Sequence, residues 1–82
     1  MYKKKKSLSI ALVGRVVPIK DIKTFIKAVS FLKHYYDDFE VIILGPTDED
    51  LAYFEECQTL VKILNLTEEI NFCGKVNLKY YE

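Results

Sequence analysis

Three short apolar runs, each followed by a glycine, constrain this chain more than any other feature of its sequence. The runs and the glycines that follow them are 9–13 with Gly14, 41–44 with Gly45, and 70–73 with Gly74. The first two runs are almost continuously aliphatic, which is typical of strands that are covered on both faces in a parallel sheet. Glycine allows the backbone to turn sharply where a strand ends. The pattern therefore predicts three parallel strands that end in glycine turns.

Two segments with helical periodicity lie between these runs. In 21–36 and again in 50–64, apolar residues recur at steps of three and four, which gathers them on one face of a helix. The acidic run Asp48–Asp50 precedes the second segment, where it suits the positive end of a helix dipole. Right-handed crossovers then predict an α/β fold. It is a Rossmann-like βαβαβ half-domain, with a three-stranded parallel sheet in the order 3-2-1 and flanking helices.

The two ends of the sequence differ from its centre in their residue pattern. Four consecutive lysines, Lys3 to Lys6, predict that residues 1–7 form a flexible, solvated basic segment. Residues 79–82 resemble the beginning of a third helix. The folded unit is therefore expected to occupy residues 8–82.

Composition excludes several classes of protein. The 82 residues carry twelve acidic and twelve basic side chains, whereas nucleic-acid binding usually needs a basic excess. No apolar run approaches the roughly 20 residues that span a bilayer, and none suits a signal peptide. Cys57 and Cys73 lack the spacing of a metal site and of a redox pair, which favours a reducing compartment. We therefore expect a cytoplasmic protein without a metal, a nucleic-acid partner or a transmembrane segment.

Ligands of open parallel sheets bind beyond the carboxyl ends of the strands, which here are followed by segments 14–20, 45–50 and 74–77. The first segment places Arg15 and Lys20 between a strand end and a helix start. Arginine offers a planar fork of donors and lysine a mobile charge, and a diphosphate can use both. The residues alone leave open the alternative that both cations are simply solvated loop residues.

Familiar nucleotide-binding fingerprints are missing from the sequence. It contains neither GxGxxG nor GxxxxGK[ST], which disfavours a dinucleotide enzyme and a P-loop NTPase. A receiver-type domain needs acidic residues where the first strand ends, and this strand ends in Val13-Gly14-Arg15. A non-catalytic, flavodoxin-like ligand-binding or signalling module remains the alternative to an enzyme.

Several segments, in order along the chain, resemble family 4 glycosyltransferases. The similar segments are 13–21 with 24–28, 42–46, 53–66 and 70–76. The first contains Gly14-Arg15 and Lys20 in the family's GR-x-x-x-x-K spacing, and the last is similar to its V-x-F-x-G-x-v strand. The acidic loop 45–50 together with Glu55-Glu56-Cys57 is most similar to the Pel-exopolysaccharide type. The resemblance covers residues 8–82.

The resemblance implies a retaining glycosyltransferase of the GT-B fold, in which two Rossmann-like domains face a cleft. Such a hexosyltransferase-type enzyme moves a sugar from a nucleotide sugar, for example a UDP-sugar, to an acceptor. It acts in polysaccharide, exopolysaccharide or glycoconjugate synthesis, with no metal or other cofactor. Residues 8–82 are similar to the first half of the C-terminal, nucleotide-sugar-binding domain and stop before the family's E-x7-E region.

The resemblance also implies roles for individual residues. Arg15 and Lys20 match the family's pair of diphosphate-binding cations. The expected loops near the nucleotide comprise Gly14, Gly45, Pro46, Gly74, Lys75 and Val76. The E-x7-E pair has no counterpart, so no catalytic residue is assigned and the 82-residue chain is expected to be inactive alone.

The expected strand order predicts self-association. In an intact domain of order 3-2-1-4, the first strand would be central, but this sequence has no counterpart of strand 4. One edge of the strand would then be open, and Ile10 to Val13 contains no charge or proline to protect it. One sheet face would also be partly bare. We therefore expect two copies to associate through the first strand or the neighbouring face.

Overall fold

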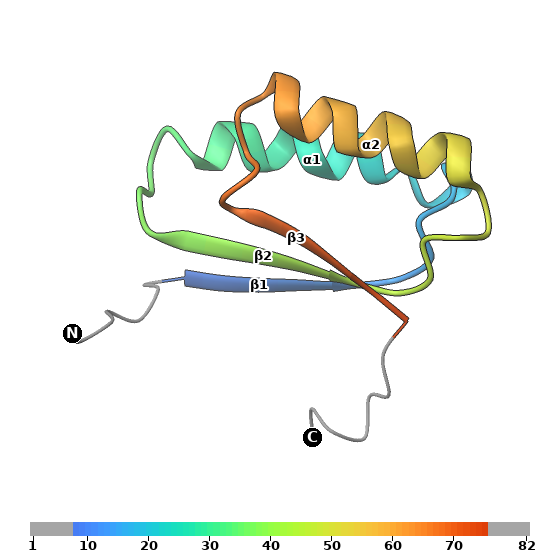
Figure 1. Ribbon diagram of the computed structural model, residues 1–82. Coiled ribbons are helices and arrows are strands. Elements are labelled where there is room, and N and C mark those ends of the chain that lie inside the picture. Colours follow the sequence, from blue (N-terminus) through green and yellow to red (C-terminus); the bar gives the residue numbers. More distant parts are fainter. Residues whose placement is uncertain (1–7, 76–82) are drawn as a thin grey trace, which may run out of the picture.

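The computed structural model describes residues 8–75, which form one sheet and one layer of helices (Figure 1). Its elements, in chain order, are β1 (Leu8–Val13), the 3-10 helix η1 (Pro18–Lys20), α1 (Ile22–Leu32), β2 (Phe39–Leu44), α2 (Leu51–Ile63) and β3 (Ile70–Gly74). The predicted basic segment 1–7, the start of a helix at 79–82 and the site residue Val76 lie outside the described residues.

All three strands are parallel, and β2 lies between β1 and β3. The pairing of β1 with β2 is regular from Leu8 opposite Phe39 to Val13 opposite Leu44. The pairing of β2 with β3 shifts between Ile43 and Leu44. The predicted order 3-2-1 and the predicted α/β, Rossmann-like half-domain are therefore confirmed.

Both α1 and α2 cover the same face of the sheet (Figure 1). This follows from the topology, because two right-handed crossovers that advance in the same direction place their helices on the same side. Side chains of β1 accordingly alternate between half-buried Leu8, Ile10 and Leu12 and exposed Ser9, Ala11 and Val13. Among the described residues the helices therefore cover one face of the sheet, and the exposed side chains of β1 lie on the other.

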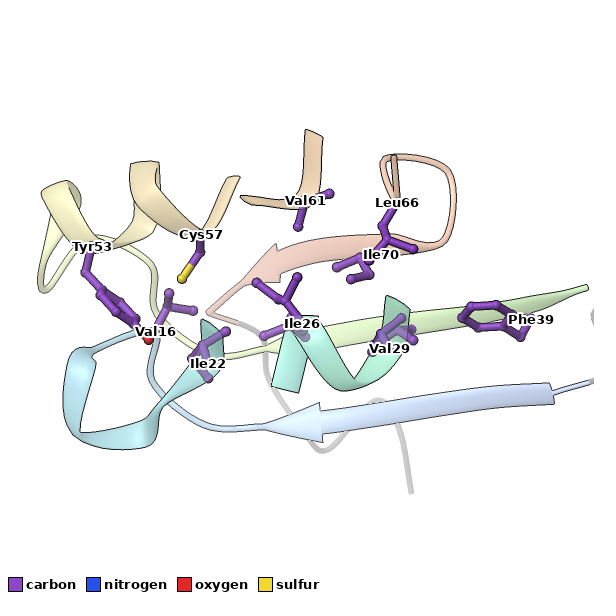
Figure 2. Close-up of a cluster of buried hydrophobic side chains, with 12 residues drawn as sticks. Val16, Ile22, Ile26, Val29, Phe39, Tyr53, Cys57, Val61, Leu66 and Ile70 are labelled. Carbon is purple, nitrogen blue, oxygen red and sulfur yellow. The ribbon is translucent and has the colours of Figure 1, made fainter. Parts of the chain in front are cut away.

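The core lies between the helices and the sheet (Figure 2). Each layer contributes side chains at the spacing that its secondary structure dictates. Its most buried residues include Ile22, Ile26 and Val29 of α1, Phe39, Val41 and Ile43 of β2, and Tyr53, Cys57 and Val61 of α2. No polar or charged residue among the described ones is buried. Fully burying one aliphatic side chain is worth about 1.5–3 kcal/mol, so this layer holds the two helices on the sheet.

The helix ends differ partly from the prediction. The second helix begins as expected, because the Asp50 side chain caps it by accepting a hydrogen bond from the Tyr53 N–H at 3.0 Å. The first helix is shorter than the predicted segment 21–36 and ends at Leu32. Tyr35 and Tyr36 continue its apolar periodicity but are 83% and 47% exposed, because the chain turns there to enter β2.

Candidate functional site

The carboxyl ends of the three strands are joined by hydrogen bonds between loop backbones. The Gly14 N–H donates to the Leu44 carbonyl at 2.8 Å, and the Gly45 N–H donates to the Gly74 carbonyl at 2.8 Å. Gly45 has a φ of 151°, and a Cβ at this position would lie 1.9 Å from the Gly14 oxygen. Only glycine fits here, because any side chain would force the two backbones apart.

A pocket opens at this edge of the sheet, with a volume of 190 Å³. Its lining residues come from all three strand ends and are Val13, Gly14, Arg15, Leu44, Gly45, Pro46 and Lys75. Pockets for whole small-molecule ligands span about 300–1,000 Å³. This pocket is smaller, so it suits one part of a ligand, such as a phosphate group, while the remainder lies outside.

Arg15 reaches the pocket from the connection between β1 and α1. The next residue, Val16, is fully buried and its N–H donates to the Pro46 carbonyl at 3.0 Å, which anchors this backbone. The Arg15 side chain is 54% exposed, and its Nη1 donates to Glu49 Oε1 at 3.3 Å. That distance is longer than the roughly 2.7–2.9 Å of a tight charge-assisted bond. Arg15 therefore has a loosely held anionic partner.

The two lysines expected at this edge have different positions. Lys75 follows Gly74, is exposed and lines the pocket together with Arg15. Lys20 is the exposed last residue of η1, in the connection that also carries Arg15, but it does not line the pocket. Neither lysine forms an ion pair with any residue between positions 8 and 75. Arg15 and Lys75 thus share the pocket, whereas Lys20 lies beside it.

Sequence reasoning missed the role of Glu49 at this edge. The acidic run 48–50 was interpreted as a set of residues for the start of α2, and Asp50 is indeed the cap. Glu49 instead points its carboxylate at Arg15, which lies 34 positions earlier in the chain. The only signal in the sequence was an acid in a loop expected to lie at the same sheet edge as Arg15.

A second group of polar side chains connects the two helices near their amino-terminal ends. The Lys23 N–H donates to the Tyr53 hydroxyl at 3.2 Å, and the Lys23 ammonium pairs with Glu56. The hydrogen bond from Lys23 to Glu56 raises the pKa of Lys23. Burial raises the pKa of the Tyr53 hydroxyl and of the Cys57 thiol, so both are neutral at pH 7. These contacts stabilise helix packing and lie outside the pocket lining.

Between residues 8 and 75, no three His, Cys, Asp or Glu side chains are grouped as a metal site would require. Over the same range, no helix has the length and apolar character needed to cross a membrane.

Comparison with known proteins adds one family. The sequence model of the family described as "Glycosyl transferases group 1" matches residues 2–81, which is nearly the whole chain. No curated protein matches the sequence.

Proposed function

Because this chain belongs to the family of group 1 glycosyl transferases, we propose that its pocket binds the diphosphate of a nucleotide-sugar donor such as a UDP-sugar. One observation carries the proposal: Arg15 and Lys75 line the same small pocket, which Gly14 and Gly45 at neighbouring strand ends also line. Backbone without side chains lets an anion approach closely. The cations then supply donors for its oxygens.

The pair of cations suits the chemistry of a leaving diphosphate. Negative charge builds up on the nucleoside diphosphate as the bond to the sugar breaks, and fixed positive charges offset it without reorganising. Arg15 would bind through its fork and Lys75 as a point charge. Lys20 would bind a second part of the same diphosphate, since it lies in the same connection as Arg15. Gly14, Gly45, Pro46, Gly74 and the stretch Lys75–Val76 would border the nucleotide.

Finer features of the reaction are proposed from the resemblance of the sequence to family 4. In this proposal the enzyme transfers a hexosyl group to an acceptor, with retention at the anomeric carbon and without a cofactor. The reaction takes place in the cytoplasm and serves polysaccharide, exopolysaccharide or glycoconjugate synthesis. In this proposal residues 8–82 are the first half of the donor-binding domain, preceded by a flexible basic segment at 1–7. The family match favours this function over a non-catalytic flavodoxin-like module.

We also propose that the 82-residue chain does not turn over a nucleotide sugar by itself. It has no two glutamates eight positions apart, so it offers no counterpart to the E-x7-E pair. Incubating the purified chain with UDP-glucose and measuring released UDP checks this. Release above the level of a protein-free blank would contradict it.

Self-association through β1 is a further part of the proposal. In the described residues β1 is an edge strand, and Val13 is 60% exposed on the face that the helices leave bare. Such edges tend to pair with another chain unless a charge blocks them. Light scattering should therefore give a dimer for the wild type and a monomer for Ala11→Lys. A wild type that stays monomeric at tens of micromolar would contradict the proposal.

An NMR titration of the chain with UDP tests the donor site. Replacing Arg15 by Ala removes a charge-assisted contact worth about 1.5–3 kcal/mol, which corresponds to a roughly 10- to 150-fold loss of affinity. Lys75→Ala and Lys20→Ala should each weaken binding less, because a lysine supplies a point charge and lacks the planar fork of an arginine. Lys62→Ala, at an exposed position near the end of α2, is the matched control and should change nothing. Equal affinity of Arg15→Ala and the wild type would rule out the assigned role.

A further inference from the structure

We infer that Glu49 competes with the diphosphate for the Arg15 guanidinium, so that donor binding requires Arg15 to exchange one anionic partner for another. This inference rests on the proposed donor site. It adds to that site a residue that tunes its affinity, and this residue does not itself line the pocket.

The position of Glu49 is set by the fold on both sides of it. Before it, the Pro46 carbonyl accepts the Val16 N–H at 3.0 Å, which fixes the start of the loop beside the Arg15 connection. After it, the Asp50 side chain caps α2 at 3.0 Å from the Tyr53 nitrogen. Only two residues, Thr47 and Asp48, separate Glu49 from Pro46, and Asp50 follows Glu49 directly. The carboxylate therefore stays within reach of Arg15.

The charge balance at the pocket gives this contact its effect. A guanidinium paired with a carboxylate presents an approaching anion with a nearly neutral group. The unpaired carboxylate would also repel the anion if it remained nearby. Lys75 forms no ion pair with any residue between positions 8 and 75, so none of these residues has to be displaced before Lys75 meets an anion. The anion is thus attracted first by Lys75, and Arg15 contributes only after it leaves Glu49.

The exchange is energetically easy. The two side chains are 54% and 41% exposed, and their nearest atoms are 3.3 Å apart. Exposed ion pairs of this kind are worth at most about 1 kcal/mol. A diphosphate, with more than one negative charge, can outcompete a single carboxylate, whereas a monoanion gains little. Glu49 would therefore lower affinity modestly and favour multiply charged ligands.

Binding of UDP to Glu49→Gln tests the inference directly. This variant keeps the size of the side chain and removes its charge, and it should bind UDP about two- to fivefold more tightly than the wild type, since 1 kcal/mol corresponds to roughly fivefold. Asp48→Asn removes the same charge from the neighbouring residue and should change affinity by clearly less. In an Arg15→Gln background, Glu49→Gln should have almost no effect, because the coupled partner is gone.

A ligand-independent measurement makes the outcome clear. NMR relaxation of the Arg15 Nε–Hε group should show a more mobile side chain in Glu49→Gln than in the wild type or Asp48→Asn. Unchanged mobility, or equal effects of Glu49→Gln and Asp48→Asn on UDP affinity, would overturn the exchange while leaving the donor site intact. Failure of the wild type to bind UDP at this pocket would overturn the proposed function, and the exchange with it.

Discussion

The interior of the helix layer contains no charged side chain among the described residues, whereas the pocket at the carboxyl edge is bordered by Arg15 and Lys75. The core is held by apolar side chains that interlock between helices and sheet. At the edge, backbone atoms of Gly14 and Gly45 set the shape and charged groups remain half in solvent. Stability and binding therefore depend on different residues here, so substitutions should separate the two properties.

The largest effect is expected at Gly45, whose backbone lies closely against that of Gly14 at the carboxyl edge. Gly45→Ala would place a Cβ 1.9 Å from the Gly14 oxygen at a φ of 151°. Overpacking and backbone strain each cost about 1–3 kcal/mol, so the variant should lose roughly 2–6 kcal/mol of stability. Gly14→Ala is the control, because nothing lies within 4 Å of its Cβ position. Urea unfolding compares them, and equal midpoints would contradict the close approach.

A change confined to the core should lower stability and leave the pocket unchanged. Ile26 is a fully buried residue of α1, and Ile26→Ala should cost about 2–5 kcal/mol of stability. Ile63 is 72% exposed at the end of α2, and Ile63→Ala should stay within about 0.5 kcal/mol of the wild type. If both variants unfolded at the same urea concentration, α1 would not present Ile26 to the core, which would contradict this helix orientation.

A change confined to the carboxyl edge should weaken UDP binding and leave the stability of the fold nearly unchanged. Arg15→Lys keeps the charge but loses the planar fork, so UDP affinity should fall, although by less than in Arg15→Ala. Stability should change by less than about 1 kcal/mol, because only the exposed pair with Glu49 is altered. A variant that lost stability without losing affinity would show that Arg15 is a structural residue.

The smallest expected effect is a pH dependence of the unfolding free energy that arises from the buried core. Burial raises the pKa of the Cys57 thiol above its value in the unfolded chain, so the folded state retains its proton to higher pH. This contribution to stability is fully present below the unfolded thiol pKa of about 8.5 and is lost as pH rises through the folded pKa. Burial raises the pKa of Tyr53 in the same direction. The unfolding free energy of the wild type should therefore fall more between pH 7 and pH values above 9 than that of Cys57→Val, which lacks the thiol. A wild-type decline no steeper than that of the variant would refute the assignment.

Most of the fold could be predicted from the sequence because each element carries its own pattern. The glycines after each apolar run located the strand ends, and right-handed crossovers fixed the order. The partly bare face was expected from the strand order, although continuous apolar runs such as 41–44 are by themselves typical of strands covered on both faces. The end of α1 was missed because Tyr35 and Tyr36 continue the apolar stripe past Leu32.

The candidate site was only partly predictable for a related reason. Arg15 was located from local spacing, since a cation directly after a strand must lie at the carboxyl edge. Its pairing with Glu49 joins residues far apart in the chain, so it depends on strand order and loop geometry together. Lys75 was expected near the nucleotide from the resemblance and lines the pocket, whereas Lys20 lies beside it.

The most direct test of the central claim is a map of the backbone amide shifts that UDP causes in the isotope-labelled wild-type chain. We expect the largest shifts at Gly14, Arg15, Gly45 and Lys75, around the pocket at the carboxyl edge. Residues of the groove between α1 and α2, such as Lys27 and Thr59, should stay unchanged. Shifts concentrated in that groove, or no saturable shifts at the pocket, would contradict the claim that this edge binds a nucleoside diphosphate.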